Sequence, residues 1–167
     1  MATVVANVLV GVATLYYHTT PGTASGSVTT EFGYTKDGVT IEYNAEITDI
    51  EVEEETFPIN RVITKEQLTV TCNLSENLLA NLERAMAGAL TGGAGVVDLG
   101  GGAQQTMALR IAGTGPGGTT RTIYIPYAHP IGVVGMAYKK GEETIIPVSF
   151  RAYQGVSGAD VVQITDA

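Results

Sequence analysis

Two stretches of alternating apolar and polar residues constrain the fold most. In residues 39–47 the odd positions, from Val39 to Ile47, are apolar and the even positions are polar. In residues 68–74 an apolar series from Leu68 to Leu74 alternates with Thr and Asn. A period of two is typical of a strand with one buried face. The sequence therefore predicts two half-buried strands.

Between these strands the apolar phase slips by one residue, because Ile50 and Val52 continue it on even positions. Such a slip predicts a bulge or a tight turn near Thr48–Asp49. Phe57-Pro58 then interrupts the pattern. Because proline cannot donate a ladder hydrogen bond, we expect the chain to cross there to a further strand.

An amphipathic helix is predicted after the strand of residues 68–74. Ser75 is a good N-cap, Arg84 lies near the negative end of the helix dipole, and Gly88 fits the left-handed residue that ends many helices. Apolar side chains recur at spacings of three and four, which places them on one face toward a sheet. The predicted core-facing residues of this helix are Leu78, Leu79, Leu82 and Met86, with Ala85 beside them.

The rest of the chain is predicted to form short strands between glycine-rich loops, with 21 glycines in 167 residues. His18 to Gly33 is a long Gly-, Ser- and Thr-rich span, a kind that is usually functional or disordered. We predict a mainly β fold, a two-sheet β-sandwich or barrel flanked by one α-helix. It forms one domain, residues 1–167, with a core over residues 8–153 and a tail over residues 154–167 that orders only on a partner.

The chain is acidic, with a formal net charge of −8. The whole acidic excess lies in residues 1–90, and the segment from Glu42 to Glu55 holds no basic residue. Tight binding of a nucleic-acid backbone needs clustered Lys and Arg. The composition therefore argues against a nucleic-acid-binding protein and is typical of one that does not retain a polyanion.

The sequence contains no recognisable catalytic or metal-binding motif. Its two histidines, His18 and His129, lie beside turn residues, and no zinc-binding or phosphate-loop motif is present. The acidic run Glu51–Glu55 lacks the spacing of a calcium loop, so we interpret it as a solvated face. Cys72, the only cysteine, is predicted to be a core side chain. We expect no enzymatic activity, no cofactor and no metal.

Several segments, taken in order, resemble the tail tube proteins of tailed bacteriophages. The most specific part is the succession of an acidic strand, a Thr-x-Pro crossing, a Thr-rich strand and a Leu-rich helix over Thr56–Gly88. Three flanking segments fit the same family: GVATLYYHTTPGT, TKDGVTIEY and KKGEETIIPVSFRAY. The resemblance covers residues 8–153.

The resemblance implies a tail-tube-like sandwich, a fold shared with the haemolysin-coregulated tube proteins of type VI secretion. In that family hexameric rings join their sheets into a continuous barrel and stack into a hollow tube through which the genome leaves. It implies a structural protein of the virion tail, assembled in the host cytoplasm. The implied partners are other copies of itself, the tape-measure, tail terminator and baseplate or tip proteins, and a sheath if the tail contracts. We also expect that genomic DNA passes without specific binding and that the chain binds no membrane.

Two alternatives stay open. A tube protein of a type VI secretion system or of a phage-derived contractile bacteriocin passes effectors rather than a genome. A ligand-binding β-sandwich module belongs to another class and needs exposed aromatic platforms, yet the chain has no Trp and most of its Tyr residues lie in strand-like runs.

Two sets of residues are candidates for an assembly role. Polar faces of the central strands are expected to line the bore, and the lumen-lining candidates are Thr40, Glu42, Asn44, Glu46, Thr69, Thr71 and Asn73. Loops that order on assembly, the acidic run and two strand arginines are expected at contacts between rings or subunits. These candidates are Thr23, Ser25, Gly26, Ser27, Glu51, Glu53, Glu54, Glu55, Phe57, Arg110 and Arg151.

Overall fold

The computed structural model describes residues 12–91, 95–100, 102, 104–136, 138, 140–141 and 143–167. Within them the chain is mainly β, as predicted, with a single α-helix. In chain order the elements are β1 (Ala13–His18), η2 (Ser25–Ser27), β2 (Thr30–Glu31), β3 (Thr35–Ile50), β4 (Asn60–Leu74), α1 (Leu79–Ala85), β5 (Ala89–Thr91), β6 (Val97–Leu99), β7 (Met107–Thr114), η3 (Pro116–Gly118), β8 (Thr120–Ile131), β9 (Ile146–Ala152) and β10 (Gln163–Asp166).

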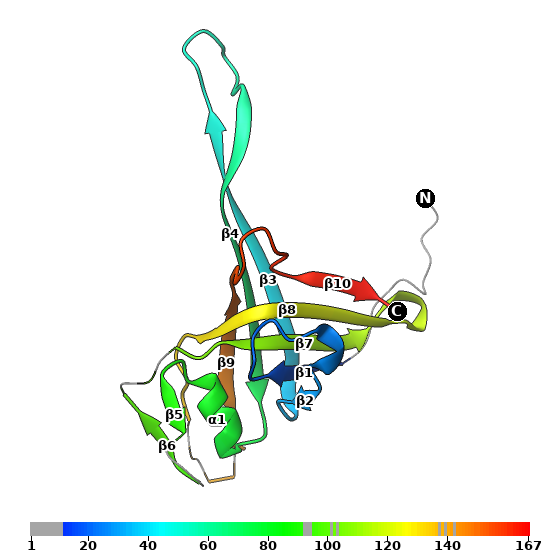
Figure 1. Ribbon diagram of the computed structural model, residues 1–167, viewed down its shortest axis with the longest axis vertical. Coiled ribbons are helices and arrows are strands. Elements are labelled where there is room, and N and C mark those ends of the chain that lie inside the picture. Colours follow the sequence, from blue (N-terminus) through cyan, green and yellow to red (C-terminus); the bar gives the residue numbers. More distant parts are fainter. Residues whose placement is uncertain are drawn as a thin grey trace.

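Eight of the strands form one antiparallel sheet in the order β2-β1-β7-β8-β9-β4-β3, with β10 paired to β8 off this path. β8 joins the two halves of the sheet, because it pairs with β7 along Thr120–Ala128 and with β9 along Ala128–Ile131. The strands of one half, β1, β7 and β8, cross those of the other half, β3, β4 and β9 (Figure 1). The sheet is therefore bent around its core, and β5 and β6 form a separate hairpin.

The core lies between the two halves of the sheet and against α1. The fully buried ring of Phe32 lies 4.5 Å from the ring of Tyr17 on β1 and 5.5 Å from that of Phe150 on β9, measured between centroids. Cys72 is a core side chain, as predicted, and burial raises the pKa of its thiol to about 12. Other large buried side chains are Leu15, Val70, Leu74, Met107, Leu109, Ile125, Ile146 and Val148.

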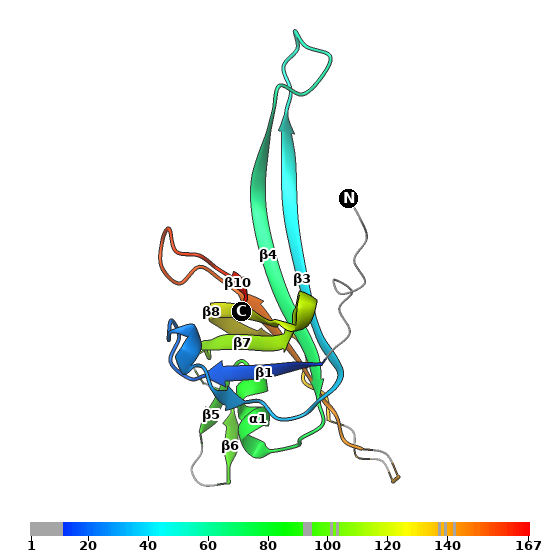
Figure 2. The ribbon, with the colours of Figure 1, turned by 90° about the vertical axis from the view of Figure 1, so that its right-hand side faces the viewer.

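β3 and β4 confirm the strands predicted from the alternation and extend beyond them. The alternate residues from Leu68 to Leu74 are buried, and those between them are half-buried on the opposite face. β9 pairs with β4 only along Thr69–Leu74. From Asn60 to Leu68, the only strand neighbour of β4 in the described chain is β3. This ribbon projects far from the body (Figure 2). We call residues 44–67 the arm and residues 51–59 its tip.

The predicted crossing at Phe57-Pro58 is wrong. These residues lie in the tip, where the chain turns back, so the strands predicted before and after them are the two sides of one hairpin. Pro58 is accommodated because the tip needs no ladder hydrogen bond from it.

The predicted bulge also lies elsewhere. Glu46 pairs with Lys65 and Ile47 with Ile63, so the extra residue is Thr64 on β4 rather than a residue at Thr48–Asp49 on β3. The Thr64 hydroxyl donates to the Glu46 carbonyl oxygen at 3.2 Å. Because β3 has no extra residue between Glu46 and Ile50, the slip in its apolar pattern moves apolar side chains to the opposite face of the arm.

The helix is shorter than predicted, because Ser75 does not cap it. The Ser75 hydroxyl donates to Glu143 Oε1 at 3.0 Å, and its N–H donates to the Tyr34 carbonyl oxygen at 2.9 Å. The N-cap position is Leu78 instead. Gly88 is not left-handed, and the chain leaves the helix in an extended conformation before reaching it.

The predicted core face of the helix is half correct. Leu82 is 9% exposed and Ala85 is buried, and Met86 packs against the core. Leu78 and Leu79, at 56% and 40% exposed, do not face the core. With the first predicted turn absent, the buried amide of Asn81 faces inward and donates to the Phe32 carbonyl oxygen at 2.8 Å.

Two segments predicted to order only on assembly or on a partner are already packed on the sheet. In the segment from His18 to Gly33, Val28 is fully buried, and the Gly22 N–H donates to the Pro126 carbonyl oxygen at 2.8 Å. The C-terminal tail contributes β10, which pairs with β8 from Arg121 to Tyr124. The polar composition of both segments predicted that they would order only on assembly. That prediction failed because composition does not reveal the backbone pairings that hold them to the sheet.

We predict that Leu82→Asp and Leu78→Asp differ strongly in stability. Leu82→Asp places a carboxylate in the seam between helix and sheet, and we expect a loss of at least about 3 kcal/mol in the free energy of unfolding. Leu78→Asp adds the same charge at an exposed position and should change that free energy by less than about 0.5 kcal/mol. Urea unfolding measures both, and equal losses would contradict the described helix.

We also predict that β10 detaches on acidification. Arg121 Nε and Nη2 donate to the two Asp166 carboxylate oxygens at 2.7 Å each, and this pairing lowers the pKa of Asp166. Because the pKa of Asp166 is lower in the folded state than in the unfolded state, the ion pair stabilises the folded state at pH values above the unfolded-state pKa. This stabilisation is lost as the pH falls through the folded-state pKa. Amide exchange of β10, corrected for intrinsic rates, should therefore accelerate below about pH 4. Asp166→Asn should remove this dependence, and a wild-type β10 that stays protected there would contradict it.

Candidate functional site

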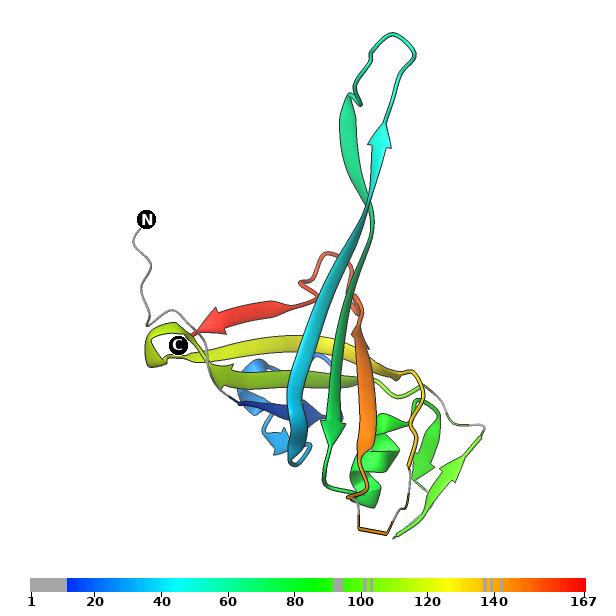
Figure 3. The same cartoon turned by 180° about the vertical axis from the view of Figure 1, so that it is seen from behind.

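All seven lumen-lining candidates lie on one side of the sheet, opposite the core. Thr40 pairs with Thr71 and Glu42 with Thr69, so their side chains share a face, and alternation adds the other three. The four candidates on β3 are exposed and the three on β4 are half-buried. We call this surface of β3, β4 and β9 the polar face; Figure 3 views these strands side by side.

The polar face carries both signs of charge, which the lumen candidates alone did not predict. Lys65 Nζ lies 2.9 Å from Glu46 Oε1 across the arm. Arg151 on β9 lies opposite Thr69 on β4 and opposite His129 on β8. The alternation of buried Val148 and Phe150 in β9 was the signal that places Arg151 outward. The surface is therefore polar and mixed rather than uniformly acidic.

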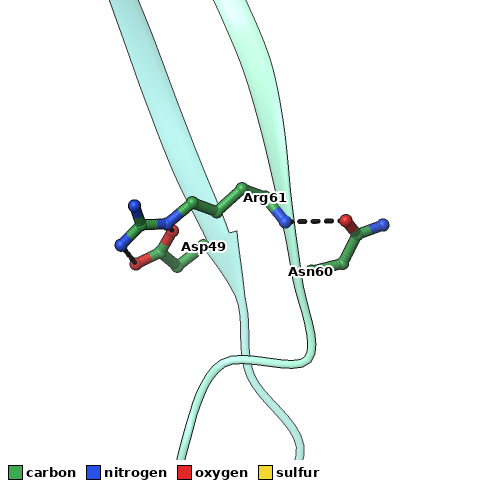
Figure 4. A network of polar contacts seen from close by, with 3 residues as sticks. All are labelled: Asp49, Asn60 and Arg61. Atoms are coloured by element: carbon green, nitrogen blue, oxygen red, sulfur yellow. Dashed lines mark hydrogen bonds and ion pairs between the residues drawn. The ribbon is translucent and has the colours of Figure 1, made fainter.

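The four candidates from the acidic run and Phe57 lie together in the arm tip. Glu51, Glu53, Glu54 and Glu55 are all exposed, and within the described residues their carboxylates form no ion pair or hydrogen bond. Phe57 is 82% exposed. Just below the tip, Arg61 Nε donates to Asp49 Oδ1 at 2.7 Å and links the two strands (Figure 4). The interpretation of the acidic run as a solvated face is confirmed for the single chain.

The arm exposes large apolar side chains on both of its faces. Ile47 pairs with Ile63 on one face, while the next pair places Val62 on the other face, which Ile50 shares. These and three neighbours near the tip are exposed: Ile47, Ile50, Val52, Phe57, Ile59, Val62 and Ile63. Soluble monomers rarely expose so many contiguous apolar side chains, which usually mark a surface of interaction.

The remaining candidates, except Arg151, gather on the outer side of β1, β7 and β8. The Tyr124 hydroxyl donates to the Thr23 carbonyl oxygen, which holds the loop of Ser25–Ser27 beside this side of the sheet. Arg110 pairs in register with Tyr16 and Tyr124. We call the surface formed by Thr23, Ser25, Gly26, Ser27, Tyr16, Arg110 and Tyr124 the arginine surface.

Arg110 is held in an unusual environment. Its guanidinium carbon lies 4.3 Å above the centroid of the Tyr16 ring, a cation–π contact. Its buried Nε finds no hydrogen-bond partner in the part of the chain that the structure describes. The sequence predicted that Arg110 lies in a strand. That Tyr16 and Tyr124 lie on either side of it could be learned only from the register of the strands.

Neither histidine forms a catalytic or metal site with described neighbours. His18 Nδ1 accepts the Thr20 N–H at 3.1 Å within a turn. The His129 ring stacks on Tyr153 at 3.9 Å, and its Nδ1 lies 3.1 Å from the Gln105 carbonyl oxygen. The described residues contain no group of three or more His, Cys, Asp or Glu suited to a metal ion. They also contain no helix long and apolar enough to cross a membrane.

The arm has an unpaired strand edge on each of its two sides within the described chain. β3 is the last strand of its sheet, so the outer edge of its 16 residues has no strand neighbour. β4 has a second open edge on the opposite side of the arm, above the end of β9. An open edge presents backbone N–H and C=O groups to any other strand.

No protein-family model matches the sequence, and none of the curated proteins is similar to it.

Proposed function

We propose that the protein is a structural, self-assembling protein of the tail tube type. Copies of the chain join into rings, hexameric as the resemblance implies, and the rings stack into a hollow phage tail tube that delivers genomic DNA. The observation that carries this proposal is the arm, a long exposed ribbon with apolar side chains on both faces and an unpaired strand edge on each side.

An arm of this kind is poorly suited to a protein that works alone. A two-stranded hairpin is marginally stable in water without packing against other elements. Here the exposed apolar residues of the arm lie beyond the core, so the single chain offers them no cover. Burial of apolar area against other copies stabilises such a ribbon by about 25 cal/mol per Å². The apolar surface of the arm therefore supports assembly as its function.

The unpaired edges support the same proposal. A ribbon open at β3 on one side and at β4 on the other can pair with a neighbour on each side, edge to edge. Repetition of this heterologous contact gives a closed ring when the rotation closes. In such a ring the bent sheet acts as the two packed layers of a tail-tube-like sandwich. The continuous barrel would leave none of these edges open.

The polar face supplies a surface suited to the bore. Its Thr and Asn side chains carry no charge, and Glu46 is neutralised by Lys65 across the arm. Without a cluster of cations, DNA finds no sites at which many counterions are released, so it passes without being retained. The same wall would suit a secretion or bacteriocin tube, and the passage of DNA comes from the resemblance alone. The tape-measure, terminator and baseplate partners belong to the proposal on the same ground.

We predict that Ile63→Lys abolishes assembly without unfolding the chain. Ile63 is 54% exposed on the arm, so the substitution should change the free energy of unfolding of the subunit by less than about 0.5 kcal/mol. The control is Val133→Lys, at a position that is 90% exposed on the body. Negative-stain microscopy of the purified full chain at rising concentration should show rings or tubes for wild type and for Val133→Lys, and neither for Ile63→Lys.

A wild-type protein that stays monomeric at every concentration would contradict the proposed function. That outcome would favour the ligand-binding module, for which an exposed arm is not required. Tubes formed equally well by Ile63→Lys would retain the function but exclude the apolar arm as the contact.

We predict that Glu42→Lys combined with Glu46→Lys gives tubes that retain DNA. The two changes leave Lys65 without its partner and add cations to the polar face, so short duplex DNA should sediment with the tubes at low salt and be released at high salt. The control, Glu31→Lys with Asp98→Lys, makes the same change in net charge at exposed positions away from the polar face. Equal retention by both variants would exclude the polar face from the bore.

A further inference from the structure

Most of the basic residues in the described part of the chain are neutralised within the subunit. Five of them form ion pairs: Lys36 with Glu143, Arg61 with Asp49, Lys65 with Glu46, Arg84 with Glu83 and Arg121 with Asp166. Among the described residues this leaves three cations without a carboxylate partner, Arg110, Arg151 and Lys140. They are the candidates to receive the unpaired carboxylates of the arm tip.

Arg110 is distinguished from the other two by its surroundings. Arg151 and Lys140 are exposed, so water satisfies their donors. Arg110 is half-buried, and its Nε is buried without a hydrogen-bond partner. A buried donor left unpaired costs free energy, and a carboxylate that reaches it removes this cost. The arginine surface therefore has a buried donor, Arg110 Nε, for which the described part of the subunit supplies no acceptor.

The arm tip has the complementary chemistry. It carries four exposed carboxylates, no basic residue and the exposed ring of Phe57. The carboxylates of one tip cannot form ion pairs with those of another tip, because like charges repel. The tip is therefore directed to a different surface of another copy, in a heterologous contact.

We propose that the arm tip of one copy docks on the arginine surface of a second copy, with a carboxylate of Glu53 or Glu54 accepting hydrogen bonds from Arg110. Phe57 then lies against the tyrosine rings that flank Arg110. This inference rests on the proposed function and specifies which two surfaces join. It also explains why Thr23 to Ser27 lie beside Arg110, because this loop forms the rim of the receiving surface.

A charge-swap experiment in the full-length protein tests the contact. The variants are Arg110→Glu, the tip pair Glu53→Lys with Glu54→Lys, and the combination of all three. The matched control is Lys140→Glu, which makes the same change in charge at an exposed cation outside the arm and the arginine surface. The critical concentration for assembly is measured by sedimentation, and circular dichroism with thermal melting establishes that each variant is folded.

We expect Arg110→Glu and the tip pair each to raise the critical concentration by at least about tenfold, because each juxtaposes like charges. The combination should restore it to within about threefold of wild type, since the opposite charges face each other again. Lys140→Glu should assemble as wild type does. This pattern would support the pairing.

Three results would overturn it. The first is normal assembly of folded Arg110→Glu, and the second is failure of the combination to recover although all variants are folded. In both cases wild type still forms tubes, so the proposed function stands and only this contact is refuted. The third is absence of any wild-type assembly, which refutes the function together with the contact.

Should Arg110→Glu not fold, a neutral cycle replaces it. Arg110→Gln and the pair Glu53→Gln with Glu54→Gln should each raise the critical concentration, and their combination should raise it no further than either alone. If the combination raised the critical concentration by the product of the two separate increases, the residues would act independently, and a direct contact would be contradicted.

Discussion

The unpaired ladder of β3 is the feature on which the rest of the structure depends. Its 16 residues form the last strand of the sheet, and their outer backbone groups meet no other strand of the described chain. In monomeric proteins such an edge strand is usually short, carries charged side chains or is covered by another element. Here the lower part of the edge strand is anchored by core residues on β4, while the upper part continues into solvent with apolar side chains. The single chain thus retains an edge that another chain can pair with.

The anchoring of the arm explains how one small domain can present several surfaces in fixed relation. The lower halves of β3 and β4 share the core with β9, and Asp49 and Arg61 hold the strands together near the tip. Thr64 adds one residue to β4, and above it apolar side chains occupy both faces of the ribbon. A ribbon that is apolar on one face suits a single partner, whereas one that is apolar on both faces suits a position between partners. In the proposed tube this geometry separates the polar face, directed at the bore, from the surfaces that join copies.

The sequence predicted those parts of the fold that alternation alone determines. The residues from Leu68 to Leu74 had the period of a half-buried strand, and both that strand and its polar side followed correctly. Prediction failed where a long-range pairing decided the outcome. Ser75 has the composition of a cap, but its hydroxyl pairs with Glu143, 68 residues away. The polar C-terminal tail looked mobile, yet the Asp166–Arg121 pair and a short ladder hold it to β8.

The candidate surfaces follow the same division. The polar face could be predicted, because strand alternation fixes which side chains share a side. The arginine surface could not, because only the register of β1, β7 and β8 places a tyrosine on each side of Arg110. The tip carboxylates were visible in the sequence as a run, but their position at the end of a projecting hairpin depended on where the chain turns.

Amide hydrogen exchange across the arm, measured as a function of protein concentration, tests the central claim most directly. The account predicts that the outward-facing amides of residues 44–67 exchange rapidly in dilute protein, because they face an open strand edge. They should become protected as concentration rises, together with the lower edge of β3, while the amides of the core strands β7 and β8 stay unchanged. Arm amides whose exchange is the same at every concentration would show that no other copy pairs with this edge, and would contradict the account.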